Sequence, residues 1–139
     1  MQLPNRFNRY LLSTTAVTMG LLLYGCGESK VAQCNKIVTV ANKAKAFSVP
    51  KDISGFGVLA DNIDKIGTEG KAIAVQDSKL KESQTELLTM YSEVSLALKA
   101  QVKATQSKDS NAVTKAKQEL ETSTAKESDL VDRINALCK

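Results

Sequence analysis

The 139-residue chain has the length of a single domain. Hydrophobic residues make up 42% and charged residues 24%, which is typical of a globular protein and excludes a disordered or fibrous one. Aromatic residues are scarce at 4%, and two prolines and seven glycines are too few for the many turns of an all-β fold. The composition therefore favours a helical protein with an aliphatic core.

The net charge of +4 is unevenly distributed. Residues 1–25 contain two arginines and no acid, so the rest of the chain has 17 basic and 15 acidic side chains. A net charge of +2 with so few aromatic residues argues against a nucleic-acid partner. The excess is concentrated in residues 26–51, where five lysines face a single acid, Glu28. These lysines could attract anionic lipid headgroups or form a solvated helix face, and the sequence leaves both interpretations open.

The amino terminus has the organisation of a targeting signal. Residues 1–9 are polar and contain Arg6 and Arg9, whereas residues 10–23 are largely apolar and uncharged. This apolar stretch is shorter than the roughly 20 residues that a transmembrane helix needs. A positively charged segment followed by a short apolar one predicts a signal peptide.

The apolar stretch ends in Leu23-Tyr24-Gly25-Cys26, which resembles the lipobox of bacterial lipoproteins. The resemblance implies that residues 1–25 are cleaved and that Cys26 receives palmitate-type acyl chains. Residues 26–139 would then form a domain anchored to a membrane and facing an extracytoplasmic compartment, either periplasm or lumen. Tyr24 departs from the pattern, because the family usually has a small residue there. An uncleaved membrane anchor and ordinary cleavage that leaves Cys26 free are the alternatives.

Four segments of helical periodicity follow. The first, about 29–47, has an apolar face of Val31, Cys34, Val38, Ala41 and Ala44, with Ile37 and Val40 beside it, and ends before Pro50. The second is predicted near 53–75, the third from Ser78 to about Thr105 after a cap at Asp77 or Ser78, and the fourth from about Asn111 to Leu137. The third has an apolar seam of Leu80, Leu87, Tyr91, Val94, Leu98 and Val102, in which Gln84 takes one position, and we expect Tyr91 in the core with its hydroxyl at the edge. The centre of the fourth, 121–129, has few apolar residues and is expected to be solvated or to pack shallowly.

Four amphipathic helices with short connections predict an all-α fold, an antiparallel up-down four-helix bundle. The chain has three cysteines, and an odd number in an exported protein leaves one unpaired. If Cys26 takes the lipid, Cys34 and Cys138 can form a disulfide. These two positions, in the first and after the last predicted helix, are adjacent only in an antiparallel bundle with an even number of helices. Two unpaired buried thiols are the alternative.

No motif points to a catalytic, cofactor or metal site. The chain has no histidine, which removes most general-base and metal-ligand designs. Gly55-Phe56-Gly57-Val58-Leu59-Ala60 matches a dinucleotide-binding pattern, but no strand is predicted before it, so we interpret its glycines as the entry turn of the second helix. Three Ser-x-x-Lys matches lack the companion motifs of penicillin-recognising enzymes. Paired acids such as Asp61 and Asp64 are expected on solvated faces.

The stretch from Asp61 to Cys138 resembles an uncharacterised family of small helical cyanobacterial proteins. The similarity lies in the sequences ADNIDKI, VQDSKL, LLTMYSEVS and LVDRINALC, together with an early Cys34-Asn35 and a terminal Ile134-Asn135-x-x-Cys138. This family has no established activity to transfer.

The sequence therefore predicts a membrane-anchored, non-enzymatic accessory or interaction lipoprotein without a cofactor. Its partners would be the membrane, through Cys26, and a protein that the sequence does not identify. A helical module that binds a small ligand or a lipid in the bundle interior is the alternative, and it requires a cavity. An enzyme is a third hypothesis, which requires a cleft with converging acids and lysines.

Overall fold

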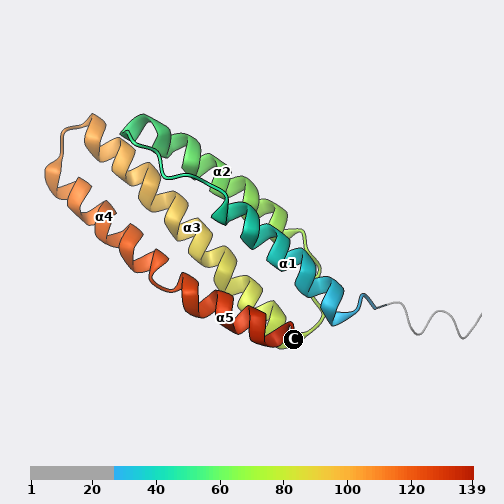
Figure 1. The fold of residues 1–139 in the computed structure, drawn as a ribbon. Coiled ribbons are helices and arrows are strands. Elements are labelled where there is room, and N and C mark those ends of the chain that lie inside the picture. The colour runs from blue at the N-terminus through green and yellow to red at the C-terminus, as the bar shows by residue number, and fades with distance from the viewer. Residues whose placement is uncertain (1–26) are drawn as a thin grey trace, which may run out of the picture.

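The computed structural model describes residues 27–139 and contains five α-helices and no strand in that range (Figure 1). The helices are α1 (Lys30–Lys45), α2 (Ile53–Lys71), α3 (Ser78–Gln106), α4 (Ser110–Thr124) and α5 (Glu127–Leu137). Helices α1 and α3 run in one direction, and α2 and the successive pair α4 and α5 run in the other (Figure 1). This is the expected antiparallel up-down four-helix bundle, with its fourth helix in two pieces. The expected signal peptide and Cys26 lie outside the described residues.

Four of the five helices begin with a side-chain cap. In each, a side-chain oxygen accepts a hydrogen bond from the backbone N–H three residues later, which satisfies a donor that the helix leaves free. The capping residues are Ser29, Asp52, Asp77 and Asp109. The predicted helix starts are therefore confirmed to within one or two residues, and Asp77 is the cap of α3.

Helix α2 ends at Lys71, four residues before its predicted end. The Gln84 side chain from α3 donates hydrogen bonds to the carbonyls of Gly70, at 2.8 Å, and Ile73, at 2.9 Å. A helix leaves its last carbonyls without internal partners, and Gln84 bonds one of them, that of Gly70, together with the Ile73 carbonyl two residues beyond the helix. This explains why a polar side chain takes a buried position in the seam of α3.

The fourth predicted helix is not continuous, because residues 125 and 126 form a turn between α4 and α5, although their backbone angles stay in the right-handed helical region. The hydroxyls of three consecutive residues, Thr122, Ser123 and Thr124, each donate to the carbonyl four residues earlier. Such bonds compete with the helix's own ladder and bend or weaken it. The prediction of one helix over 111–137 was wrong at this point, and the three hydroxyl residues give a physical reason.

Helix α3 is the central element and packs against α2, α4 and α5. Its predicted seam is confirmed, since Leu80, Leu87, Tyr91, Val94 and Leu98 are buried and Val102 is half-buried. In α1 the most buried positions are Gln33, Cys34, Ile37 and Val40, whereas Val31 is 61% exposed. The predicted face of α1 was therefore wrongly centred. The Gln33 side chain accepts a hydrogen bond from the backbone of Gln76, 2.8 Å away, and this contact turns that side of α1 towards the α2–α3 connection.

A disulfide joins Cys34 of α1 to Cys138, the residue after α5. The two Cα atoms are 5.6 Å apart and 104 positions apart in sequence, which confirms the predicted pairing. Helix α1 packs mainly against α2, so this bond is its covalent connection to the opposite side of the bundle. A cross-link closing a loop of this length removes much of the freedom of the unfolded chain.

Three of the five lysines in residues 26–51 form ion pairs. Lys36 pairs with Glu28 at 2.7 Å, Lys43 with Glu69 at 2.6 Å and Lys30 with Asp77 at 3.4 Å. All are solvent-exposed pairs, each of which contributes little to stability. For these three lysines the structure favours the solvated helix face over a surface reserved for lipid headgroups.

We expect loss of the disulfide to destabilise the bundle strongly. Replacing Cys34 and Cys138 together with alanine should lower the free energy of unfolding by about 2–5 kcal/mol, the usual cost of removing a disulfide from a small exported domain. The measurement is urea unfolding followed by circular dichroism, with and without a thiol reductant. Cys26→Ser is the matched control and should leave the midpoint unchanged. A wild-type midpoint that does not respond to complete reduction of the bond would contradict this account.

Candidate functional site

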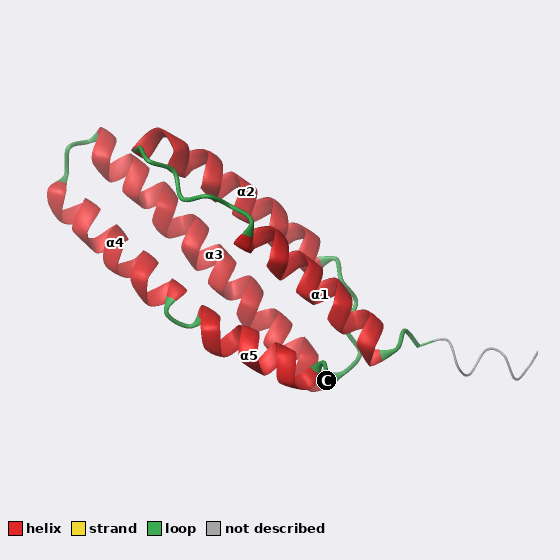
Figure 2. Ribbon diagram, viewed as in Figure 1, coloured by secondary structure: helices red, strands yellow, loops and turns green. Residues whose placement is uncertain are grey.

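The bundle is incomplete over half its length because α1 is short. Helix α1 has 16 residues, whereas α3 has 29. After α1 the chain continues as a non-helical connection, residues 46–52, beside the upper half of α2 and α3 (Figure 2). Pro50 restricts the residue before it to extended conformations, which prevents the helix from continuing. Over this length an extended, non-helical segment takes the place of a helix on one side of the bundle.

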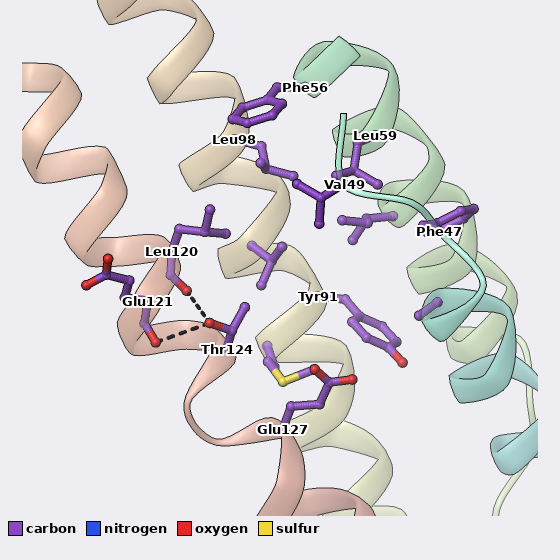
Figure 3. A pocket seen from close by; sticks show the side chains of 14 residues that line it. Phe47, Val49, Phe56, Leu59, Tyr91, Leu98, Leu120, Glu121, Thr124 and Glu127 are labelled. Atoms are coloured by element: carbon purple, nitrogen blue, oxygen red, sulfur yellow. Dashed lines mark hydrogen bonds between the residues drawn. The ribbon is translucent and has the colours of Figure 1, made fainter. Parts of the chain in front are cut away.

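An open cleft of about 370 Å³ lies between this connection and the junction of α4 and α5. Figure 3 shows Phe47 and Val49 on one side, Leu120, Glu121 and Thr124 on the other, and Tyr91 and Leu98 of α3 between them. The lining is apolar or aromatic except for Glu121, Thr124 and Glu127. Its volume lies within the range of small-molecule binding sites, and a largely apolar wall with a few polar groups is their usual composition.

All three aromatic side chains of residues 27–139 line this cleft. Phe47 comes from the connection, Phe56 from α2 and Tyr91 from α3. Aromatic rings offer a large apolar area and an electron-rich face. Their concentration in one place, in a chain with so few of them, marks the cleft as a special surface of the domain.

Tyr91 is 5% exposed, in agreement with its predicted core position. Burial raises the pKa of its hydroxyl to about 12, and the nearby carboxylate of Glu127 contributes to the same shift. A phenol with this pKa stays protonated at neutral pH. Tyr91 therefore offers the cleft a neutral hydroxyl and not a base.

The polar end of the cleft is built by the break in the fourth helix. The Thr124 hydroxyl donates to the carbonyls of Leu120, at 2.9 Å, and Glu121, at 3.2 Å (Figure 3). Glu121 lies in the last turn of α4 and is exposed, whereas Glu127 is the first residue of α5 and is half-buried. Within residues 27–139 neither carboxylate takes part in an ion pair.

Gly55 allows the connection to pack directly on the first turn of α2. A Cβ at this position would lie 2.5 Å from the Cβ of Pro50, which is far too close. A Cβ at Gly57, by contrast, would have nothing within 4 Å. Both glycines lie inside α2, in agreement with their interpretation as the helix entry, and the Gly55 N–H donates to the capping Asp52.

The paired acids noted in the sequence form an ion-pair link between two helices at the surface. Asp61 and Asp64 of α2 both pair with Lys99 of α3, at 3.3 and 2.6 Å. The hydrogen bond from Lys99, followed by one from Ser95, lowers the pKa of Asp64. These exposed groups form no cleft with one another, in keeping with the expected solvated face.

The described residues contain neither a metal-binding cluster nor a helix suited to span a membrane. No group of three or more His, Cys, Asp or Glu side chains in residues 27–139 is arranged to hold a metal ion. None of the helices described in that range is both long and apolar enough to cross a membrane.

Of the residues singled out from the sequence, the structure brings Cys34 and Cys138 together, while Cys26 falls outside the described residues. The sequence did not indicate that Glu121 and Glu127 border the same cleft. The available signal was the apolar-poor centre of the fourth helix, which was interpreted only as a solvated or shallowly packed face.

In comparisons with protein-family models, curated proteins and solved structures, nothing matches this chain.

The two glycines of α2 provide a matched test of the cleft wall. Gly57→Ala should raise the free energy of unfolding by up to about 1 kcal/mol, because alanine is the better helix former and has open space there. Gly55→Ala should instead lower it by about 1–3 kcal/mol, because its methyl group displaces the Pro50 segment. Urea unfolding of both variants measures the difference. An equal gain in stability at both positions would show that the connection does not pack on α2 as described.

Proposed function

We propose that this protein is a lipid-anchored, non-catalytic accessory protein that acts by binding, and that its binding site is the cleft beside residues 46–52. The observation that carries the proposal is the cleft itself. The cleft has a continuous apolar wall and a small polar end. It lies between the non-helical connection after α1 and the break between α4 and α5. A small apolar ligand is the occupant that this geometry supports best.

The chemistry of the lining favours binding over catalysis. The ionisable groups of the cleft are two glutamates and the Tyr91 hydroxyl, whose pKa is about 12. Thr124 is the one aliphatic hydroxyl in the lining, and it already donates to two backbone carbonyls. No activated nucleophile is evident, since activation requires an adjacent base or a lowered pKa.

The proposed anchor is compatible with a cleft open to solvent. Gly27, the residue after Cys26, lies next to Gln76 in the α2–α3 connection, at the same end of the bundle as the disulfide. From Cys34 to Ala44, which lines the cleft, α1 rises by about 15 Å. A lipid on Cys26 would thus hold the disulfide-bonded end at the membrane and leave the cleft further out. The disulfide itself fits an oxidising compartment such as the periplasm or a lumen.

The anchor predicts the distribution of the protein between membrane and soluble fractions. Cys26→Ser should move the protein from the membrane fraction to the soluble fraction, because two or more acyl chains provide stable anchoring and their loss removes it. Fractionation followed by immunodetection measures this. The Cys34→Ala, Cys138→Ala double variant, which changes the other two cysteines, should stay with the membranes. Unchanged membrane association of Cys26→Ser would rule out the anchor at this residue.

Binding in the cleft can be tested with a neutral amphiphile, decyl maltoside, below its micellar concentration. The full-length chain carrying Tyr10→Phe and Tyr24→Phe has Tyr91 as its single tyrosine, so its fluorescence reports on the cleft. We expect saturable binding that Ala44→Phe weakens by tenfold or more, on the order of 1.4 kcal/mol, because the larger ring occupies the apolar wall. Lys36→Ala, on the same helix but outside the lining, is the control. Absence of saturable binding would remove the cleft as the basis of the function.

A further inference from the structure

We propose that the cleft selects amphiphiles that carry a net positive charge, with an alkylammonium head at the α4–α5 junction and an apolar body against α2 and α3. This inference rests on the proposed function, since it names the class of ligand for the same cleft. The distribution of charge around the opening carries it, and the aromatic side chains support it independently.

The first argument is charge complementarity. The lining contains two carboxylates, Glu121 and Glu127, and no lysine or arginine. Seven of the fifteen acids in residues 27–139 have a basic partner within 4 Å, whereas Glu121, Glu127 and six others have none in that range. The Glu127 side chain extends towards Tyr91, whereas that of Glu121 points away from the cleft on the outer side of α4 (Figure 3). A half-buried carboxylate without a partner in an apolar cleft, as Glu127 is, is a ready counter-charge for a cationic ligand.

The end of α4 adds to the negative potential. The carbonyl end of a helix carries a partial negative charge, which a basic residue in the last turn commonly offsets. Helix α4 has no basic residue in its last turn and has Glu121 there instead. A cation at the junction would therefore meet the end of α4 as well as Glu127.

The second argument comes from the aromatic rings. Phe47, Phe56 and Tyr91 come from three different elements and all line the cleft. A ring face attracts an ammonium group. Tyr91 lies near Glu127, so its ring and that carboxylate can both contact a cation, whereas Phe56 lies at the other end of the cleft and would contact the apolar body (Figure 3). A neutral ligand would use the rings but gain nothing from Glu127.

Two basic residues lie close enough to weigh against this. Lys126, in the break between α4 and α5, borders a different shallow surface together with Thr122 and Ser123. Lys45, the last residue of α1, shares a shallow adjoining surface with Thr124 and Glu127. It forms no ion pair with Glu127 among the described contacts and is not part of the cleft lining. Neither lysine belongs to the lining, which contains acids and no base. A phosphate next to the ammonium, as in a phospholipid headgroup, would be repelled by Glu127.

The test compares three probes with the same alkyl chain: cationic decyltrimethylammonium, zwitterionic decylphosphocholine and neutral decyl maltoside. Each is titrated below its micellar concentration into the full-length Tyr10→Phe, Tyr24→Phe chain, and Tyr91 fluorescence gives the dissociation constant. We expect the cation to bind about tenfold more tightly than either of the other two, the effect of one charge-assisted contact. The preference should decrease at high salt, because the opening is exposed to solvent.

Variants of single acids assign the effect to the cleft. Glu127→Gln should bring the affinity for the cation down to about that for decyl maltoside. Glu121→Gln, whose carboxylate points out of the cleft, should reduce the preference less. Glu119→Gln is the matched control, because Glu119 lies on the same helix, pairs with Lys115 and is outside the cleft. Ala44→Phe should weaken all three probes.

The possible outcomes separate this inference from the proposed function. Equal binding of the three probes, or a cation preference that survives Glu127→Gln, overturns the inference and leaves a cleft that binds apolar ligands. Binding of the zwitterion as tight as that of the cation also overturns it. If no probe binds saturably, the inference and the binding role of the cleft fail together.

Discussion

The disulfide between Cys34 and Cys138 fixes how the first helix sits on the rest of the bundle. Helix α3 holds α2, α4 and α5 around itself by extensive side-chain packing, whereas α1 packs mainly against α2. Its non-covalent connections include the buried side chains of Ile37 and Val40, exposed ion pairs and the hydrogen bond that Gln33 accepts. Exposed pairs contribute little, so the disulfide and core packing together hold α1 beside the end of α5. The connection after α1 forms one wall of the cleft, so the position of that wall depends on the disulfide as well.

The cleft results from two local interruptions that face each other across the bundle. On one side Pro50 ends helical geometry, and Gly55 lets the extended chain pack on α2. On the other side the run of hydroxyl residues ending at Thr124 breaks the fourth helix and leaves Glu121 and Glu127 on either side of the break. Two continuous helices in these places would bring aliphatic side chains together and fill the space.

The parts of the fold that follow from periodicity and caps could be predicted from the sequence. Helix starts at Ser29 and Asp77, the seam of α3 and the pairing of Cys34 with Cys138 all come from spacing or from counting. The break after Thr124 could not, because hydroxyl residues are tolerated in helices and their competition with the backbone depends on what packs around them. The cleft could not either, since its aromatic residues come from three elements whose approach is set by tertiary packing.

Several features around the cleft would be unfavourable in a sequence selected for stability alone. Glu121 lies at the negative end of α4, where a lysine would be stabilising. Val49 is 79% exposed at the opening, and Glu127 lies there half-buried without a basic partner in the described part of the chain. Asp64 of α2, by contrast, is matched with Lys99 of the neighbouring helix. Natural sequences depart from local consistency mainly where function requires it. That these departures lie around one apolar cleft, opposite the aromatic residues, is the strongest reason to regard it as the working surface of the protein.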